Sequence, residues 1–167
     1  MSKKVLILFA SRSGSTADTA TIIAHEMKLK QKEITVDVLP VKKAKDITSY
    51  DLIILGSAIW MGKPLPEMLS FIKSYLPILK TKKVVCFALC MNLRTENDKT
   101  IKESAAYLTP FSSCTPIETA IFAGGVDYLK LGFFARRIVK MVKSPQGDFR
   151  NIDKIKTWAS DIIVKYC

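Results

Sequence analysis

The sequence has little histidine and cysteine, which limits the metal chemistry it can support. His25 is the only histidine, and the four cysteines (Cys86, Cys90, Cys114 and Cys167) contain no CxxC pair. This spacing does not match a structural zinc site, so we expect reduced thiols and no bound metal. We interpret His25 as structural, because it falls in the middle of a predicted helix.

Long apolar runs are also absent. No run reaches the roughly 18 residues that are needed to span a bilayer, and the N-terminal residues lack the small-residue cleavage site of a signal peptide. We therefore expect a cytoplasmic protein, with the inner face of the membrane as the one place where it would meet lipid.

Acidic residues are scarce relative to basic ones. The chain of 167 residues has 26 Lys and Arg against 15 Asp and Glu, which gives a net charge of +11. Such an excess suits an anionic partner, although lysines on a solvated surface would give the same total. RNA-binding aromatic motifs and helix-turn-helix patterns are absent, so we expect no nucleic-acid partner. The length predicts a single domain over residues 1–167, and no pattern specifies an oligomeric state.

Two hydrophobic patterns alternate along the chain. Short runs rich in β-branched and other apolar residues are typical of strands buried on both faces of a parallel sheet. They cover residues 5–9, 34–39, 52–55, 84–89 and 117–122. Stretches with apolar residues three to four positions apart predict amphipathic helices. They cover residues 16–30, 65–79, 97–108 and 152–166. Alternation of strand and helix predicts an α/β, doubly wound, five-stranded parallel sheet.

The segment after the first predicted strand is almost uncharged and rich in hydroxyls. It reads Ser11-Arg12-Ser13-Gly14-Ser15-Thr16, and no acidic residue precedes Asp18. The N-terminus of a helix has unpaired N–H donors and a partial positive charge, so it suits a phosphate. Gly14 permits close backbone approach or a positive φ. We predict phosphate binding here, although the loop contains neither GxGxxG nor GxxxxGK[ST].

This loop resembles the [ST]xTGxT phosphate loop of the flavodoxins, in which it holds the phosphate of FMN. Position 13 is Ser where that family usually has Thr, which keeps the hydroxyl group. The resemblance implies FMN as the cofactor. It also implies a sheet of order 2-1-3-4-5 with the ligand at the carboxyl ends of the strands, near the topological switch point.

The same resemblance implies two further flavin-binding loops. The first follows the third strand, where Trp60 would stack on the isoalloxazine ring and Gly56 and Gly62 would let the backbone approach it. The alternative is that Trp60 anchors the loop on its own helix. The second loop follows the fourth strand and lacks the Tyr that many flavodoxins have there, so Asn92 or backbone groups would meet the ring. The predicted contacts are Ser57, Ala58, Ile59, Trp60, Met61 and Gly62 in one loop and Cys90, Met91, Asn92 and Leu93 in the other.

An insert at about residues 124–148, after or within strand five, is similar to one in the menaquinone-dependent protoporphyrinogen oxidases, a group with the flavodoxin fold. Residues 128–147 have five basic side chains and no acidic one. A basic amphipathic helix can lie on an anionic membrane surface, but it can also pack its apolar side on its own domain. We expect Arg136, Arg137 and Lys140 to bind substrate propionates or lipid headgroups.

Three functions fit these observations. The first is implied by the resemblance: an FMN-dependent oxidoreductase of heme biosynthesis that oxidises protoporphyrinogen and reduces a quinone, with an anionic tetrapyrrole as substrate. The second is a small electron-transfer flavodoxin, although such proteins are usually acidic. The third is a non-enzymatic membrane-surface module, which the intact phosphate loop disfavours. Flavin chemistry needs no dedicated acid or base, so we assign no catalytic side chain.

Overall fold

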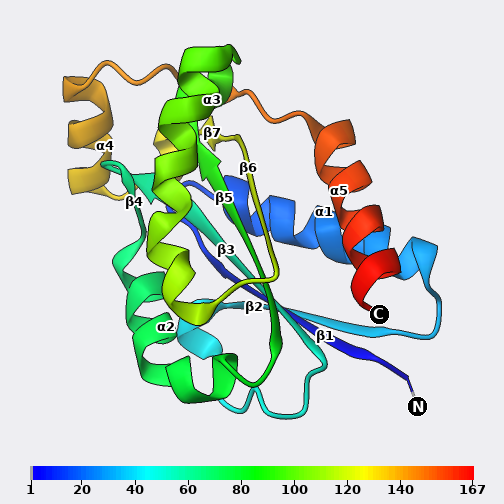
Figure 1. The fold of residues 1–167 in the computed structure, drawn as a ribbon. Coiled ribbons are helices and arrows are strands. Elements are labelled where there is room, and N and C mark those ends of the chain that lie inside the picture. The colour runs from blue at the N-terminus through cyan, green and yellow to red at the C-terminus, as the bar shows by residue number, and fades with distance from the viewer. Residues whose placement is uncertain (1) are drawn as a thin grey trace.

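Five parallel strands form the central sheet of the structure, a computed structural model that describes residues 2–167 (Figure 1). They are β1 (Lys4–Ala10), β2 (Thr35–Pro40), β3 (Leu52–Trp60), β5 (Lys83–Cys90) and β6 (Glu118–Ala123). Their order is β2-β1-β3-β5-β6, and every neighbouring pair is parallel. β5 and β6 are the fourth and fifth strands of this parallel sheet, so the predicted order 2-1-3-4-5 is confirmed.

Helices cover both faces of the sheet (Figure 1). Helices α1 (Ser15–Lys30) and α5 (Ile152–Tyr166) pack together on one face. On the other face lie α2 (Pro66–Leu79) and α3 (Asp98–Ala105), which continues into the 3-10 helix η3 (Ala106–Cys114). Two short 3-10 turns, η1 (Val41–Lys43) and η2 (Met91–Arg94), follow β2 and β5. No helix within residues 2–167 combines the length and apolarity that a membrane crossing requires.

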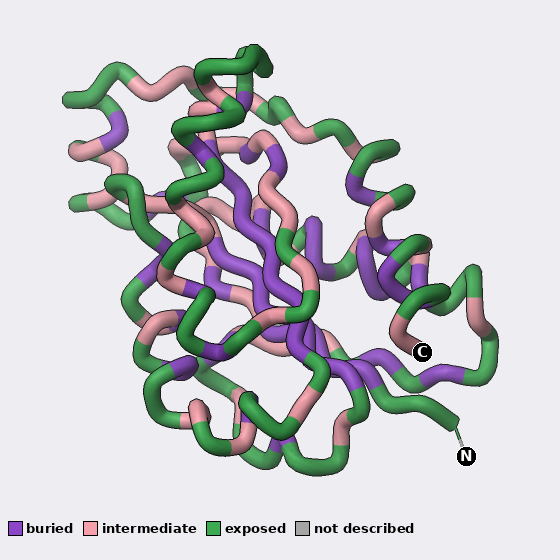
Figure 2. The backbone as a smooth tube through the Cα atoms, in the orientation of Figure 1, coloured by how far each residue is buried: buried purple, intermediate pink, exposed green. Residues whose placement is uncertain are grey.

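The strands are apolar on both sides because the sheet has two cores. Along β1, Val5 and Ile7 pack toward α1 and α5, whereas Leu6 and Leu8 pack toward α2. Successive side chains of a strand point to opposite faces, so a continuous apolar run fills both layers at once. The buried backbone in Figure 2 follows these central strands.

β3 is longer than its sequence pattern predicts. We expected a loop after residue 55, but the strand continues to Trp60 and turns back into β4 (Lys63–Pro64), which pairs with it in an antiparallel hairpin. The two turn residues, Met61 and Gly62, have φ of 50° and 77°. Positive φ at both positions is characteristic of the tight type I′ hairpin turn. The predicted second flavin loop is therefore a strand end and a hairpin.

The insert forms a small unit beside the carboxyl ends of the strands. It contains the ribbon strands β7 (Gly125–Val126) and β8 (Gly147–Asp148), the 3-10 turn η4 (Tyr128–Lys130) and the helix α4 (Phe133–Met141). β7 and β8 pair antiparallel, so the insert leaves the domain and returns to it at nearly the same place. The hydroxyl of Tyr128 donates a hydrogen bond to the carbonyl oxygen of Ser144, which ties the two ends of the insert together.

Candidate functional site

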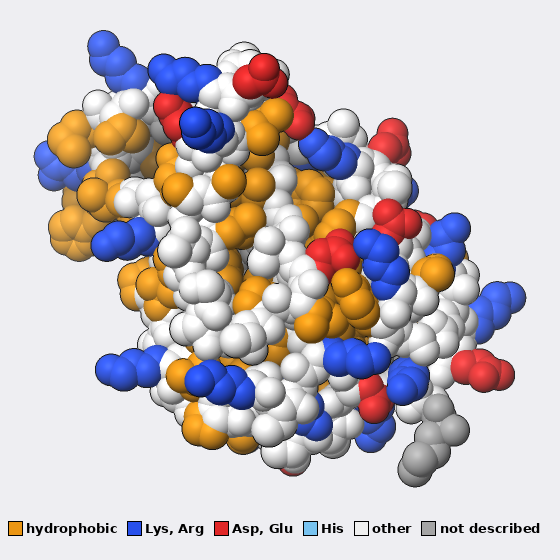
Figure 3. All heavy atoms as spheres, viewed as in Figure 1, with side chains coloured by type: hydrophobic (Ala, Val, Ile, Leu, Met, Phe, Trp, Pro, Cys, Tyr) orange, Lys and Arg blue, Asp and Glu red, His pale blue; other side chains and the backbone are white. Residues whose placement is uncertain are grey.

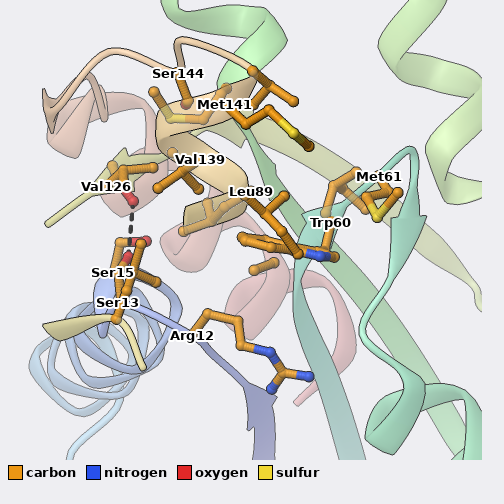
Figure 4. A pocket seen from close by; sticks show the side chains of 18 residues that line it. Arg12, Ser13, Ser15, Trp60, Met61, Leu89, Val126, Val139, Met141 and Ser144 are labelled. Carbon is orange, nitrogen blue, oxygen red and sulfur yellow. Dashed lines mark hydrogen bonds between the residues drawn. The ribbon is translucent and has the colours of Figure 1, made fainter. Parts of the chain in front are cut away.

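The loop between β1 and α1 has the geometry of an anion site. Gly14 is the N-cap of α1 with φ 94°, and its N–H donates to the Oγ of Ser11 at 3.0 Å. The Oγ of Ser13 donates to the carbonyl oxygen of Gly125 at 3.1 Å, shown as a dashed line in Figure 4. The first N–H groups of α1 have no partner within the helix, because they precede its first hydrogen-bonded turn. They are free to bind an anion.

The side chain of Thr16 gives the clearest indication that a ligand binds at this loop. It is fully buried, and its Oγ1 has no hydrogen-bond partner in the structure. A buried hydroxyl without a partner costs free energy, and Thr16 is the second residue of α1. A phosphate at this helix end would accept the hydrogen bond that Thr16 lacks. Of the sequence-predicted loop residues, Ser15 lines the adjacent cavity together with Arg12 and Ser13.

Arg150 fixes this loop to the end of the insert. Its Nη1 donates to the carbonyl oxygen of Ser15 at 3.0 Å and to Oγ1 of Thr19 at 3.1 Å. Its Nη2 pairs with Asp148 at 2.7 Å. The hydrogen bond from Arg150 lowers the pKa of Asp148, and the same pairing raises the pKa of Arg150. Sequence reasoning did not single out Arg150, because no local pattern links residues that are 135 positions apart.

A cavity of about 410 Å³ opens from this loop along the carboxyl ends of the strands (Figure 4). Its largely apolar lining comes from the loop after β1, the end of β3 with the following turn, the end of β5 with the start of η2, and the insert. The lining residues are Arg12, Ser13, Ser15, Ala58, Ile59, Trp60, Met61, Leu89, Met91, Gly124, Gly125, Val126, Leu131, Ile138, Val139, Met141, Val142 and Ser144. Met61 and Met141 are 81% and 76% exposed, so they mark the opening of the cavity to solvent.

The end of β3 contributes one wall. Four of its predicted contacts, Ala58 to Met61, line the cavity, and Trp60 points into it (Figure 4). Ser57 does not line it: its Oγ accepts from the N–H of Leu65 at 2.9 Å and thereby holds the start of α2. Gly62 does not line it either, because it serves the hairpin turn. The cavity wall ends at Met61.

Gly56 has a different role from the one we predicted. A Cβ added there would lie 2.1 Å from Cζ of Phe87, its neighbour in the register of β3 and β5. The Phe87 ring occupies the space that a side chain would need. Gly56 therefore accommodates a core aromatic ring, and our prediction that it lets the backbone approach a flavin does not match the structure.

The segment after β5 meets the cavity through only part of the predicted set. Leu89 and Met91 line it. Asn92 instead directs its amide toward α3, where Nδ2 lies 3.3 Å from Oε2 of Glu103. Cys90 is buried with its Sγ 3.5 Å from Oγ of Ser104, and Leu93 is buried as well. The predicted role of the Asn92 side chain at the cavity is not what the structure shows, because α3 supplies it with partners.

The insert forms a further wall of the cavity, which we did not predict from the sequence. Val139 of α4 is buried and points into the cavity beside Val126 of β7 and Leu89 (Figure 4). Val139 is the one buried residue of α4, so this part of the helix packs on its own domain, over the carboxyl ends of the strands. The apolar positions of this helix were visible in the sequence, but the surface that they cover was not.

The three basic residues predicted to bind substrate or membrane lie in different surroundings. Arg136 turns inward, and its Nη2 donates to the carbonyl oxygens of Leu129 and Leu131 at 3.3 and 3.2 Å. Arg137 and Lys140 are exposed, and the Arg137 guanidinium lies 5.7 Å from the centre of the Phe133 ring. Arg136 thus holds the insert together, whereas Arg137 and Lys140 face solvent.

Arg12 is the one cationic side chain among the cavity-lining residues, and its charge is partly neutralised. Its Nη1 and Nη2 donate to the two carboxylate oxygens of Glu67 on α2 at 2.5 and 3.1 Å. The hydrogen bond from Arg12 lowers the pKa of Glu67, so this carboxylate stays ionised at neutral pH. The pair fixes Arg12 at the base of the cavity.

Comparison with known proteins decides the family. The flavodoxin domain family model matches residues 6–153. The chain belongs to the flavodoxin family. FMN is therefore its cofactor, as the flavodoxin-like loop implied. Flavodoxin 1 from Bacillus cereus superposes with a TM-score of 0.58 and 17% identity, covering 99% of both chains, which shows the shared fold.

Two relatives of this flavodoxin-family chain have names that indicate different functions. The chain is 26% identical to protoporphyrinogen IX dehydrogenase [quinone] from Escherichia coli K12 over 149 residues, which covers 86% of this chain and 81% of that protein. It is 35% identical to probable flavodoxin 1 from Bacillus subtilis over 88 residues, covering 50% of this chain and 54% of that protein.

The residues of this flavodoxin site fit FMN. The orphaned Oγ1 of Thr16 and the unpaired first N–H groups of α1 suit its phosphate. The apolar cavity beside them, with Trp60 on one side and Val139 on the other, suits its aromatic ring. Ser13, Ser15, Gly125 and Val126 lie between these two environments and would contact the chain that joins ring and phosphate.

Proposed function

We propose that this flavoprotein oxidises protoporphyrinogen IX to protoporphyrin IX and transfers the electrons to a quinone. FMN supplies the electron acceptor that no side chain provides. The E. coli relative, whose match covers 86% of this chain, has this activity in its name.

The observation that carries the proposal is the wall that the insert builds over the FMN site. Val139, Met141 and Val142 make the open side of the cavity apolar, and Met61 faces them across its mouth. An apolar mouth excludes water and favours largely apolar reactants such as a tetrapyrrole or a quinone ring. Arg137 and Lys140 are exposed on the same helix and would attract the propionates of the tetrapyrrole.

A second function is supported by the likeness to probable flavodoxin 1: transfer of electrons to a protein partner. The two functions differ in what reaches the flavin. A protein acceptor takes electrons at an exposed edge of the flavin, whereas a tetrapyrrole must enter the mouth between Met61 and Met141. Assays with each class of reactant separate them.

The test is steady-state oxidation of protoporphyrinogen IX by the FMN-loaded protein without oxygen, followed through porphyrin fluorescence. We expect porphyrin to exceed the small amount that the bound FMN itself can oxidise only when a quinone is present, and the apoprotein to be inactive because it lacks the electron acceptor. Repeated turnover without a quinone would contradict the proposed acceptor, and no porphyrin from a fully loaded protein that still reduces a protein acceptor would instead support the electron carrier.

We also propose that the insert contacts an anionic membrane surface, where a quinone would be reached. Its outer side has an apolar patch of large exposed side chains: Leu129, Phe133, Phe134, Met141 and Val142. Figure 3 shows hydrophobic and basic side chains together over α4. Aromatic and aliphatic groups flanked by lysine or arginine favour the interface between headgroups and acyl chains.

The double variant Arg137→Glu/Lys140→Glu should therefore bind anionic vesicles more weakly. Each basic residue near such a surface contributes about 1 kcal/mol, so reversing two charges should lower partitioning at least about thirtyfold at low salt. Sedimentation with phosphatidylglycerol vesicles measures this change. Lys28→Glu/Lys30→Glu, an equal charge change at the far end of α1, is the control and should bind much as the wild type does. Equal losses in both variants would show that only the net charge matters.

A further inference from the structure

Lys130 extends from the insert over the phosphate loop. It ends the turn η4, and its side chain lies above Gly14: a Cβ built on that glycine would be 3.6 Å from Cδ and 3.8 Å from Nζ of Lys130. The ammonium group is therefore within a few ångströms of the backbone that caps α1. Among residues 2–167, no other lysine lines the two cavities that meet at this loop.

A second, smaller cavity joins Lys130 to the FMN site. It has a volume of about 290 Å³ and shares Ser13, Ser15, Gly125 and Val126 with the large cavity. The large cavity is apolar, whereas the small one is lined mainly by polar and charged groups. A phosphate held by the loop would lie where these two cavities meet, with Lys130 on its open side.

The carboxylates around the small cavity have other partners or lie farther away. Asp148 pairs with Arg150 at 2.7 Å, and Oδ1 of Asp127 accepts from the N–H of Leu129 at 2.9 Å. Asp18 also lines the cavity, from the first turn of α1. Within residues 2–167, no carboxylate lies within 4.0 Å of the Lys130 ammonium. Its charge is free to pair with a ligand.

We propose that Lys130 is a phosphate-binding residue, which the insert supplies to FMN. A phosphate monoester has a charge of about −1.5 to −2 at neutral pH, and a lysine ammonium strengthens its binding through a charge-assisted hydrogen bond. The loop then holds the phosphate from the sheet side with neutral donors, and Lys130 covers it from the insert. This role of Lys130 in binding FMN does not depend on which substrate reaches the flavin.

The test compares the affinities of the apoprotein for FMN and riboflavin, which differ only in the phosphate, by quenching of flavin fluorescence. Lys130→Met should raise the Kd for FMN about tenfold and change the Kd for riboflavin by less than about twofold. Lys130→Arg keeps the charge and should stay within about threefold of the wild type for FMN. Added salt should weaken FMN binding less in Lys130→Met than in the wild type.

Lys143→Met is the matched control, since Lys143 belongs to the same insert but lines neither cavity. It should leave both affinities unchanged. Equal losses of FMN and riboflavin affinity in Lys130→Met would overturn the proposal, because they would show that Lys130 only balances Asp18 and Asp127 or supports the insert. An unchanged Kd for FMN, or a wild-type protein without preference for FMN, would overturn it as well.

Discussion

Replacing Gly14 with valine should lower the affinity for FMN about tenfold to a hundredfold. Gly14 has φ 94°, a conformation that β-branched residues hardly ever adopt. Strain of about 1–3 kcal/mol at such a position is relieved when the loop changes shape. The N–H groups of the loop would then no longer converge on the phosphate. Flavin fluorescence titration of the refolded apoprotein measures the loss.

Gly14→Asn is the control for this prediction, because asparagine tolerates the left-handed conformation better than other side chains do. A Cβ at this position meets only the flexible Lys130 side chain, at ordinary contact distance. The asparagine variant should therefore retain most of the affinity. If Gly14→Val bound FMN as tightly as Gly14→Asn does, the backbone conformation of this loop would not be what holds the phosphate.

Gly56→Ala should destabilise the fold by about 3 kcal/mol. The new Cβ would lie 2.1 Å from Cζ of Phe87, whose ring is fully buried. That ring cannot simply move, because its edge packs against Trp158 with the ring centres 6.0 Å apart. Denaturant unfolding of the apoprotein measures the change. Gly132→Ala is the control: its added Cβ would meet nothing within 4 Å, and it should cost less than about 1 kcal/mol.

A smaller side chain at position 87 should relieve the clash. Phe87→Leu alone removes part of a core ring and should cost about 1–2 kcal/mol. The double variant Gly56→Ala/Phe87→Leu should be more stable than the sum of the two single effects by at least about 1 kcal/mol. Strict additivity, or a Gly56→Ala protein as stable as the wild type, would show that Phe87 does not determine the residue at position 56.

The fold could be predicted because the alternation of patterns is strong. Val5 to Leu8 are all apolar, which is typical of a parallel strand covered on both faces, and each following helix has one apolar side. The hairpin after β3 was missed because Gly56 and Gly62 look like loop residues. One of them instead accommodates Phe87 from a neighbouring strand, and the other provides a positive φ for a tight turn.

The site could be predicted only in part. The phosphate loop could be predicted because its residues are consecutive, so that a short stretch of sequence contains the whole signal. The insert wall depends on where α4 packs, and amphipathicity shows that a helix has a buried side without showing what it covers. We predicted that Asn92 or backbone groups would meet the flavin ring. The hydrogen-bond partners of the Asn92 side chain, Glu103 and Ser104, lie on a helix whose packing the sequence does not specify. Arg150 acts across 135 positions and has no sequence signal at all.

The most direct test of the proposed function is anaerobic mixing of the FMN-loaded protein with protoporphyrinogen IX while the visible absorbance of the flavin is recorded. Protoporphyrin formation removes six electrons and each FMN accepts two, so with the protein in excess we predict that about three flavins are bleached for each porphyrin that appears. Adding a quinone should then restore the oxidised flavin spectrum. A loaded protein whose flavin stays oxidised in the presence of protoporphyrinogen, although dithionite reduces it fully, would contradict the proposed oxidation.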